Sequence, residues 1–401
     1  MKVVSVVGAR PNLMKMAPLL WEMKRQEGIK PLLVHTGQHY DAALTDIFFR
    51  QLDLPAPNYH LGVGSGSHSY QTAHVMLKLE QLLQQISPDL VLVVGDVNST
   101  LAAALVAAKL QIPIAHVEAG LRSFDRTMPE EINRLLTDAV ASYLFVTEPS
   151  GVENLRREGL EQFLQDGAPI EEVSPEIMAG RGGDPSAPPR WGAFVGNVMI
   201  DTLQALRERA ETEAQVEIPD GPYALVTLHR PSNVDEPRTL GRIIQALSRV
   251  AQEIPLLFPC HPRTRKRLQE FGLDTGGILK TGPHSGYSPN GSISLLEPLG
   301  YLEFLKLMAH ARLVFTDSGG IQEESTILGI PCLTLRENTE RPITLTVGTN
   351  RLVGTDPEKI FAGAEAALSN RWAKWGRPPL WDGKAAQRIV KILRLTKYFL
   401  V

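Results

Sequence analysis

The stretch DLVLVVGDVNST, residues 89–100, joins an uninterrupted apolar run to a glycine, an aspartate and the start of a helical pattern. A strand that is apolar at every position is buried on both of its faces, which is typical of a parallel sheet covered by helices. The stretch therefore predicts an α/β fold.

The same alternation of strands and helices extends in both directions from this stretch. Similar apolar runs occur at 3–8, 31–37, 112–120 and 142–147, and the pattern then restarts at 223–229, 255–260, 312–317 and 330–335. Because the pattern restarts, the 401 residues predict two doubly wound, Rossmann-like domains. Ligands of such domains bind at the carboxyl ends of the strands, so we expect the active site in the cleft between the domains.

The domain boundaries follow from the same pattern. We expect the first domain to comprise residues 1–194 and to be joined by an amphipathic C-terminal helix in 380–401, leaving 195–379 for the second. Residues 160–192 are rich in glycine, proline and acidic residues and have a poor apolar pattern. This composition predicts an irregular excursion from the first domain that is exposed or mobile.

Charge and composition exclude several classes of partner. The 41 Lys and Arg nearly balance the 44 Asp and Glu, without a basic stripe or an acidic tail, so we expect no nucleic-acid and no membrane partner. No apolar run approaches the roughly 18 residues of a membrane span, and the N-terminus resembles a first strand rather than a signal peptide. Cys260 and Cys332 lie in short apolar runs, which indicates buried, reduced thiols in a cytoplasmic protein.

Motifs for metals and common cofactors are missing from the sequence. It contains no HExxH, EF-hand loop, P-loop or GxGxxG pattern. We therefore expect neither a metal ion nor a cofactor.

The turn GARPNLMK (8–15) follows the first strand and opens a helix. Arg10 and Lys15 lie near the positive N-terminus of that helix, which favours a clamp for a diphosphate. A loop arginine and a solvated lysine are the plainer interpretation.

A second turn, TDSGGIQEES (316–325), has the features of a phosphate site. Ser318, Gly319 and Gly320 open a helix with a backbone that a phosphate can approach closely. Glu323 and Glu324 lie one turn further, where a carboxylate can accept hydrogen bonds from ribose hydroxyls. An ordinary helix cap with dipole-favoured acids is the alternative. Together with the first turn, the pattern favours a nucleotide diphosphate.

Two further titratable side chains end buried strands. Asp96 follows 89–95, and His229 follows 223–228. Taken singly, each is more often structural: the aspartate can cap the helix that starts near Ser99, and the histidine can donate to a nearby carbonyl.

The stretch HVEAGLRSFDRTMPEEINR (116–134) is unusually dense in charge. Glu118 ends an apolar strand, where an unpaired carboxylate is costly to bury. The helix that follows has one apolar stripe, formed by Ile132, Leu135, Leu136, Ala139 and Val140, and its other side carries Glu130, Glu131, Arg134 and Asp138.

Glu130 has three interpretations at this point. It can transfer protons, it can complete a Thr127-x-x-Glu130 capping box, or it can form a surface ion pair with Arg134 one turn along the helix. The spacing leaves all three open.

Seven motifs, taken in order, resemble those of the non-hydrolysing UDP-N-acetylglucosamine 2-epimerases. They are GARPNLMKMAPL, GDVNSTLAA, HVEAGLRS, PEEINR, TLHRPSNVD, TDSGGIQEE and TERPITLTVGTNRLVGTD. The resemblance runs from residue 1 to about 370 and is interrupted only at 160–192. Asn12 and Pro231 depart from the family pattern, which has Glu and the second Arg of HRRE at these positions.

The resemblance implies a fold similar to the GT-B glycosyltransferases, with a UDP-binding second domain and UDP between the domains. It implies a catalytic set of Asp96, Glu118, Glu130 and His229. It implies that Arg10 and Lys15 bind the diphosphate, that Ser318, Gly319 and Gly320 bind phosphate, that Glu324 binds the ribose, and that Arg341 lines the same cleft.

The resemblance also implies the reaction, which is reversible epimerisation of UDP-GlcNAc to UDP-ManNAc at C2. Because the C2 proton is weakly acidic, the family eliminates UDP across C1–C2 to give a 2-acetamidoglucal. It then adds UDP back with a proton on the other face, which requires carboxylates on both faces of the ring. We expect a cytoplasmic homodimer that supplies UDP-ManNAc for the synthesis of cell-surface polysaccharide.

Four alternatives to this activity stay open. The same chemistry can act on a related sugar such as UDP-2,3-diacetamido-glucuronate. A hydrolysing relative would release free ManNAc, a GT-B glycosyltransferase would need an acceptor, and a UDP-sugar sensor would not catalyse.

Overall fold

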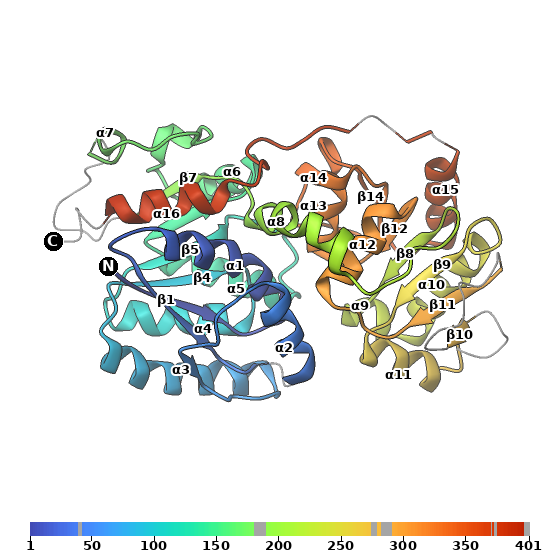
Figure 1. Ribbon diagram of the computed structural model, residues 1–401, viewed down its shortest axis with the longest axis horizontal. Coiled ribbons are helices and arrows are strands. Elements are labelled where there is room, and N and C mark those ends of the chain that lie inside the picture. The colour runs from blue at the N-terminus through green and yellow to red at the C-terminus, as the bar shows by residue number, and fades with distance from the viewer. Residues whose placement is uncertain are drawn as a thin grey trace. The chain divides into compact units, whose positions relative to one another are not determined.

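The computed structural model describes residues 1–38, 42–179, 190–273, 279–281, 291–369, 371–372 and 375–396. The chain forms two compact units (Figure 1). Unit 1 consists of Met1–Ala205 and Pro379–Val401, and unit 2 of Leu206–Pro378. Unit 1 thus continues past residue 194, the end expected from the sequence, into a helix that crosses the division.

Unit 1 is built on a parallel sheet with the strand order β3-β2-β1-β4-β5-β6-β7. Its strands are β1 (Lys2–Val7), β2 (Lys30–His35), β3 (Tyr59–His60), β4 (Leu90–Val94), β5 (Ile114–Ala119), β6 (Tyr143–Val146) and β7 (Trp191–Phe194). Its helices are α1 (Arg10–Arg25), α2 (Ala42–Gln51), α3 (His68–Ile86), α4 (Asn98–Lys109), α5 (Pro129–Val140), α6 (Pro149–Arg157), the 3₁₀ turn η1 (Leu164–Gly167), α7 (Pro175–Ala179), the first half of α8 (Val198–Glu213) and α16 (Ala385–Thr396).

The core of unit 1 explains why its strands are apolar throughout. Every residue of β4 is buried, as are five of the six residues of β1. Figure 1 shows α3 and α4 on one side of this sheet and α1 with α16 on the other. Helices on both faces bury the central strands completely, as the run 90–94 predicts.

Unit 2 repeats the architecture with the strand order β10-β11-β9-β8-β12-β13-β14, again parallel throughout. Its strands are β8 (Ala224–Thr227), β9 (Leu256–Pro259), β10 (Leu279–Thr281), β11 (Ile293–Leu296), β12 (Leu313–Thr316), β13 (Cys332–Thr334) and β14 (Asn350–Leu352). Its helices are α9 (Pro231–Val234), α10 (Pro237–Val250), α11 (Pro262–Glu270), α12 (Tyr301–His310), α13 (Gly319–Leu328), α14 (Ile343–Thr346) and α15 (Pro357–Leu368). The α/β fold with two doubly wound domains is confirmed.

The segment 160–192 differs from its prediction. The described part is irregular and many of its polar residues are exposed, as expected, but six apolar side chains are buried: Leu160, Phe163, Leu164, Ile170, Val173 and Met178. Phe163 forms a parallel bridge with Gly192 of β7, and Pro169 forms one with Phe194. The segment therefore covers the β7 end of the sheet. Residues 180–189 lie outside the described part of the chain.

Two global expectations can be compared with the structure. Both cysteines are free and buried, as predicted, and burial raises the pKa of each thiol to about 12. Among the described residues, no helix has the length and apolarity needed to cross a membrane.

Candidate functional site

Two of the predicted catalytic carboxylates lie at the carboxyl ends of neighbouring strands of unit 1. Asp96 follows β4, and Glu118 is the last residue but one of β5, which pairs with β4. The register of β5 against β6 shifts at Glu118, whose φ is 75°, in the left-handed region that side chains rarely adopt. Strain of this kind persists only where the surroundings enforce it, and it concentrates at functional sites.

Lys15 is the partner of Glu118. Its Nζ lies 2.6 Å from Glu118 Oε2, and both side chains are buried. The lysine also lies against Gly95, where an added Cβ would be 2.9 Å from Nζ. The sequence places Lys15 near a diphosphate, whereas the structure places its ammonium group beside the carboxylate that is a candidate for proton transfer.

Asp96 is held by a second buried pair. Arg134 Nη2 lies 2.6 Å from Asp96 Oδ2, and Arg134 Nη1 lies 2.7 Å from Glu131 Oε2. Glu131 also accepts hydrogen bonds from the backbone N–H groups of Ser123 and Phe124. No role is predicted for Glu131 from the sequence, because only the fold brings the turn of Ser123 and Phe124 over α5.

Glu130 lies in the first turn of α5, and the structure shows neither the capping box nor the surface ion pair considered for it. The N-cap of α5 is Met128, and the Thr127 hydroxyl donates to Asp125, so the capping box is absent. Arg134 is buried against Asp96 and Glu131, so the surface pair is absent too. Within the described residues, the half-buried Glu130 carboxylate has no hydrogen bond or ion pair.

The helix α5 buries its polar face, whereas an amphipathic helix ordinarily buries its apolar face. Its polar face is buried, with Glu131, Asn133, Arg134, Thr137 and Asp138 each less than 9% exposed. Its apolar stripe faces outward, and Leu136 is 45% exposed. A helix that buries charged groups at the ends of β4 and β5 serves a site rather than a core.

In unit 2, His229 is oriented by a buried carboxylate. Its Nδ1 lies 3.0 Å from Asp317 Oδ1, and Asp317 also accepts the backbone N–H groups of His229 and Arg230. Burial acts to raise the pKa of Asp317, but His229 and these hydrogen bonds hold it below its ordinary value. About half of the His229 side chain is exposed, so its ring is available for proton transfer. The side-chain partner of His229 is thus the Asp317 carboxylate rather than the carbonyl considered from the sequence.

In the predicted phosphate turn, residues 316–325, the side chain of Arg341 lies against Gly319. Ser318 is the N-cap of α13, but its side chain makes no capping hydrogen bond, which disfavours the ordinary-cap interpretation. A Cβ on Gly319 would lie 2.4 Å from Arg341 Nη1, so only glycine allows this approach. Arg341 is held in turn by Glu323 and Glu340, each at 2.5 Å. A helix N-terminus and a guanidinium therefore lie side by side, an arrangement that favours phosphate binding.

The remaining predicted residues lie near these two turns. Arg10 is the first residue of α1, and its guanidinium lies 5.8 Å from the centre of the Phe48 ring. Gly320 is the second residue of α13. Glu324 is buried and accepts a 2.7 Å hydrogen bond from the Tyr301 hydroxyl, and burial raises the pKa of its carboxyl to about 8.

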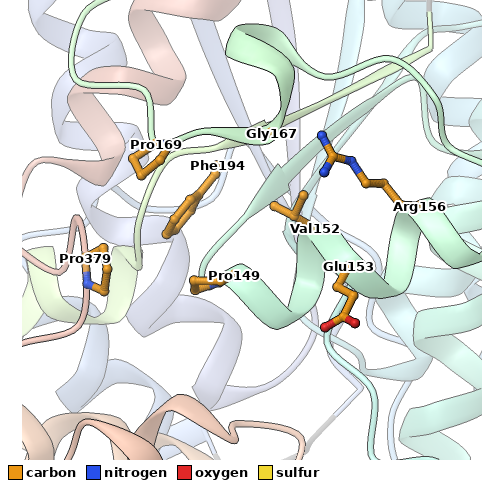
Figure 2. A pocket seen from close by; sticks show the side chains of 8 residues that line it. All are labelled: Pro149, Val152, Glu153, Arg156, Gly167, Pro169, Phe194 and Pro379. Atoms are coloured by element: carbon orange, nitrogen blue, oxygen red, sulfur yellow. The ribbon is translucent and has the colours of Figure 1, made fainter.

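The pocket of about 340 Å³ in Figure 2 is a separate feature of unit 1. It is lined by Pro149, Val152, Glu153, Arg156, Gly167, Pro169, Phe194 and Pro379, none of which is a predicted site residue. Among the described residues, no group of three or more His, Cys, Asp or Glu side chains is arranged to hold a metal ion.

Comparison with known proteins shows the family of the chain. The family model described as UDP-N-acetylglucosamine 2-epimerase matches residues 21–394. The UDP-N-acetylglucosamine 2-epimerase of Methanocaldococcus jannaschii is 41% identical over 99% of this chain and 100% of that protein. The Methanococcus maripaludis protein of the same name is 40% identical over 98% of each chain.

The structural comparison gives the same result. The crystal structure of the M. jannaschii UDP-GlcNAc 2-epimerase in complex with UDP-GlcNAc and UDP has a TM-score of 0.83, with 40% identity over 98% of this chain and 99% of that one. The chain therefore belongs to the UDP-N-acetylglucosamine 2-epimerase family.

Proposed function

We propose that the protein reversibly converts UDP-GlcNAc to UDP-ManNAc by eliminating UDP across C1–C2 and adding it back to the glycal. The observation that carries the proposal is the placement of Asp96 and Glu118 at the carboxyl ends of β4 and β5. Glu130 lies in the first turn of α5, the helix whose Arg134 pairs with Asp96. Two of these carboxylates face a buried cation, at 2.6 Å in each case, and the third is without a partner in the described residues. Such a set can remove a proton from one ring face and return one to the other.

The paired cations suit this chemistry because a buried charge is tolerated when it is paired and hydrogen-bonded. Lys15 serves Glu118, and Arg134 serves Asp96. His229, oriented by Asp317, is the fourth proton-transfer group in the proposal. The reaction moves protons and a diphosphate without net oxidation, so it requires neither a metal ion nor a nicotinamide.

We assign the UDP moiety to the α13 turn of unit 2 and to Arg10. Ser318, Gly319 and Gly320 present the helix N-terminus to phosphate, and Arg341 adds a guanidinium beneath it. Glu324 would bind the ribose hydroxyls, with Tyr301 fixing its carboxyl. Charge at the departing diphosphate is thereby stabilised by groups that are already oriented.

The proposed substrate is UDP-GlcNAc rather than a more modified sugar. The UDP-2,3-diacetamido-2,3-dideoxy-D-glucuronate 2-epimerase of Pseudomonas aeruginosa is 36% identical over 98% of this chain, below the 41% of the UDP-GlcNAc enzyme. We further propose that the product feeds cell-surface polysaccharide synthesis and that the reaction is cytoplasmic, which agrees with two free, buried thiols.

Incubating the protein with UDP-GlcNAc in deuterium oxide tests the mechanism. Each turnover breaks the C2–H bond and returns a proton from an enzyme group that exchanges with water. NMR spectra should therefore show UDP-ManNAc with deuterium at C2 and protium at C1. Full epimerisation with protium retained at C2 would contradict elimination and re-addition, and release of free ManNAc would indicate a hydrolysing enzyme.

We also propose that the protein is a homodimer formed through α5. The apolar stripe of this helix includes Leu136, at 45% exposure, together with the half-buried Ile132, Leu135 and Val140. An apolar helix face in water marks an association site, and identical chains associate most often through the same patch on both copies. A second copy packed on this face would restrict the motion of α5, the helix that contains Arg134.

Replacing Leu136 by Glu should convert the dimer into a monomer. Because a two-fold interface carries the substitution twice, we expect dimerisation to weaken by at least about a hundredfold. Sedimentation equilibrium measures this change directly. Tyr59→Glu, at a 38% exposed position on β3, is the matched control and should leave the mass unchanged. A dimeric Leu136→Glu protein would place the interface elsewhere.

A further inference from the structure

The His116 ring joins two backbone turns of unit 1. It lies on β5 and is fully buried. Its Nε2 is 2.9 Å from the carbonyl oxygen of Gly95, and its Nδ1 is 2.6 Å from Asp138 Oδ1. A carbonyl oxygen only accepts hydrogen bonds, so Nε2 must carry a hydrogen.

Asp138, on the buried face of α5, is an acceptor as well. Burial acts to raise the pKa of its carboxyl, but His116, Arg122 and the Gly120 N–H hold that pKa below its ordinary value. Nδ1 of His116 is within hydrogen-bonding distance of this carboxylate. The ring therefore contacts Gly95 through one nitrogen and Asp138 through the other.

The two ends of this connection lie beside two different catalytic candidates. Gly95 immediately precedes Asp96. The second oxygen of Asp138 accepts the N–H of Gly120 at 3.0 Å, two residues after Glu118. The chain Gly95–His116–Asp138–Gly120 therefore links the turn after β4 to the turn after β5 through three hydrogen bonds.

The Asp138 carboxylate at the centre of this connection is paired. Arg122 Nη2 lies 2.7 Å from Asp138 and 2.6 Å from Glu158. Arg190 adds a hydrogen bond to the backbone oxygen of Asp138. Buried charges are tolerated when they are paired and hydrogen-bonded in this way.

We propose that His116 and Asp138 are positioning residues that fix Asp96 and Glu118 relative to one another. This inference rests on the proposed epimerisation, in which those carboxylates exchange protons with one substrate. Displacing a reacting group by about 1 Å can cost on the order of 10²-fold in rate. A link between the two turns holds them to that tolerance.

Two substitutions of His116 separate its two hydrogen bonds. The amide of His116→Asn reaches the position of Nδ1 and keeps Asp138 paired, but it leaves the Gly95 oxygen unpaired. The amide of His116→Gln reaches the position of Nε2 and keeps Gly95 paired, but it leaves Asp138 Oδ1 without its ring partner. Asp138→Asn tests the other partner, because it places an amide where three donors converge.

We expect each folded variant to lose about tenfold to a hundredfold in kcat with UDP-GlcNAc. The affinity for UDP should stay within about threefold of wild type by calorimetric titration, because the proposed phosphate groups lie in other turns. UDP and the glycal should accumulate during turnover, since misplaced carboxylates complete one half-reaction better than the other. A purely structural role would lower stability without producing the intermediate.

The control is Asp382→Asn, which disrupts the ion pair of Asp382 with Arg388, at 2.5 Å, in the same unit. This variant should lose stability and keep its kcat. Absence of epimerisation by wild-type protein would refute the proposed function itself. Active wild type together with unchanged kcat in any folded His116 or Asp138 variant would overturn the positioning role.

Discussion

Glu118→Gln is expected to lower kcat for epimerisation by roughly 10²–10⁴-fold, the usual contribution of a positioned general acid or base. The substitution keeps the shape of the side chain and removes its capacity to exchange a proton. It also leaves Lys15, 2.6 Å away in the wild type, without a counter-charge. Steady-state rates with UDP-GlcNAc measure the effect, and Asp96→Asn and Glu130→Gln should give losses of the same order.

Glu148 offers a matched control for this experiment. It is also a buried glutamate, and it follows β6, the next strand of the same sheet. It accepts a hydrogen bond from Ser150 at the start of α6 and has no role in the proposed chemistry. Glu148→Gln should stay within about threefold of wild-type kcat. Equal losses in Glu118→Gln and Glu148→Gln would show that burying any amide there disturbs the enzyme.

Phe163→Ala is expected to lower the free energy of unfolding of unit 1 by about 3–5 kcal/mol, the cost of removing a buried aromatic ring. The ring is 1% exposed, packs in the core under the sheet, and lies beneath the Arg156 guanidinium at 5.2 Å. Denaturant or thermal unfolding measures this loss, which corresponds to a fall in Tm on the order of 10 °C.

Phe124, which is 74% exposed in the same unit, is the comparison. Phe124→Ala should change stability by less than about 0.5 kcal/mol. If the two variants were equally stable, residues 160–179 would not belong to the core. The low apolar periodicity of 160–192 predicts a dispensable segment, and the buried Phe163 argues that a deletion through it will unfold the unit.

How far the sequence predicts the fold depends on the kind of signal. Long, fully apolar runs such as 90–94 become central strands, because only a covered parallel sheet suits them. The strands β3, β7, β10, β11 and β14 were not predicted, because their sequences, YH, WGAF, LKT, ISLL and NRL, lack the longer Val- and Leu-rich runs that mark the other strands. Residues 160–179 were misjudged for a related reason, since side chains that enter a core from irregular backbone follow no period.

The candidate site shows a different limit. Strand-end positions predict Asp96 and Glu118, because the carboxyl ends of adjacent parallel strands meet at one edge. Their cations, Arg134 and Lys15, are distant in sequence, and no spacing rule connects them. The face of α5 was the hardest feature, since an amphipathic helix ordinarily buries its apolar side, whereas this helix buries Arg134 and Asp138.

The pairing of α1 with α16 has a consequence for protein synthesis. Unit 1 needs a helix that the ribosome makes about 180 residues after Ala205. At roughly 5–20 residues per second, the nascent first unit waits about 10–40 s for that helix, while the residues of unit 2 emerge in one continuous block. Unit 1 is therefore completed only after unit 2, and termination between Pro378 and α16 would release a protein with an uncovered α1.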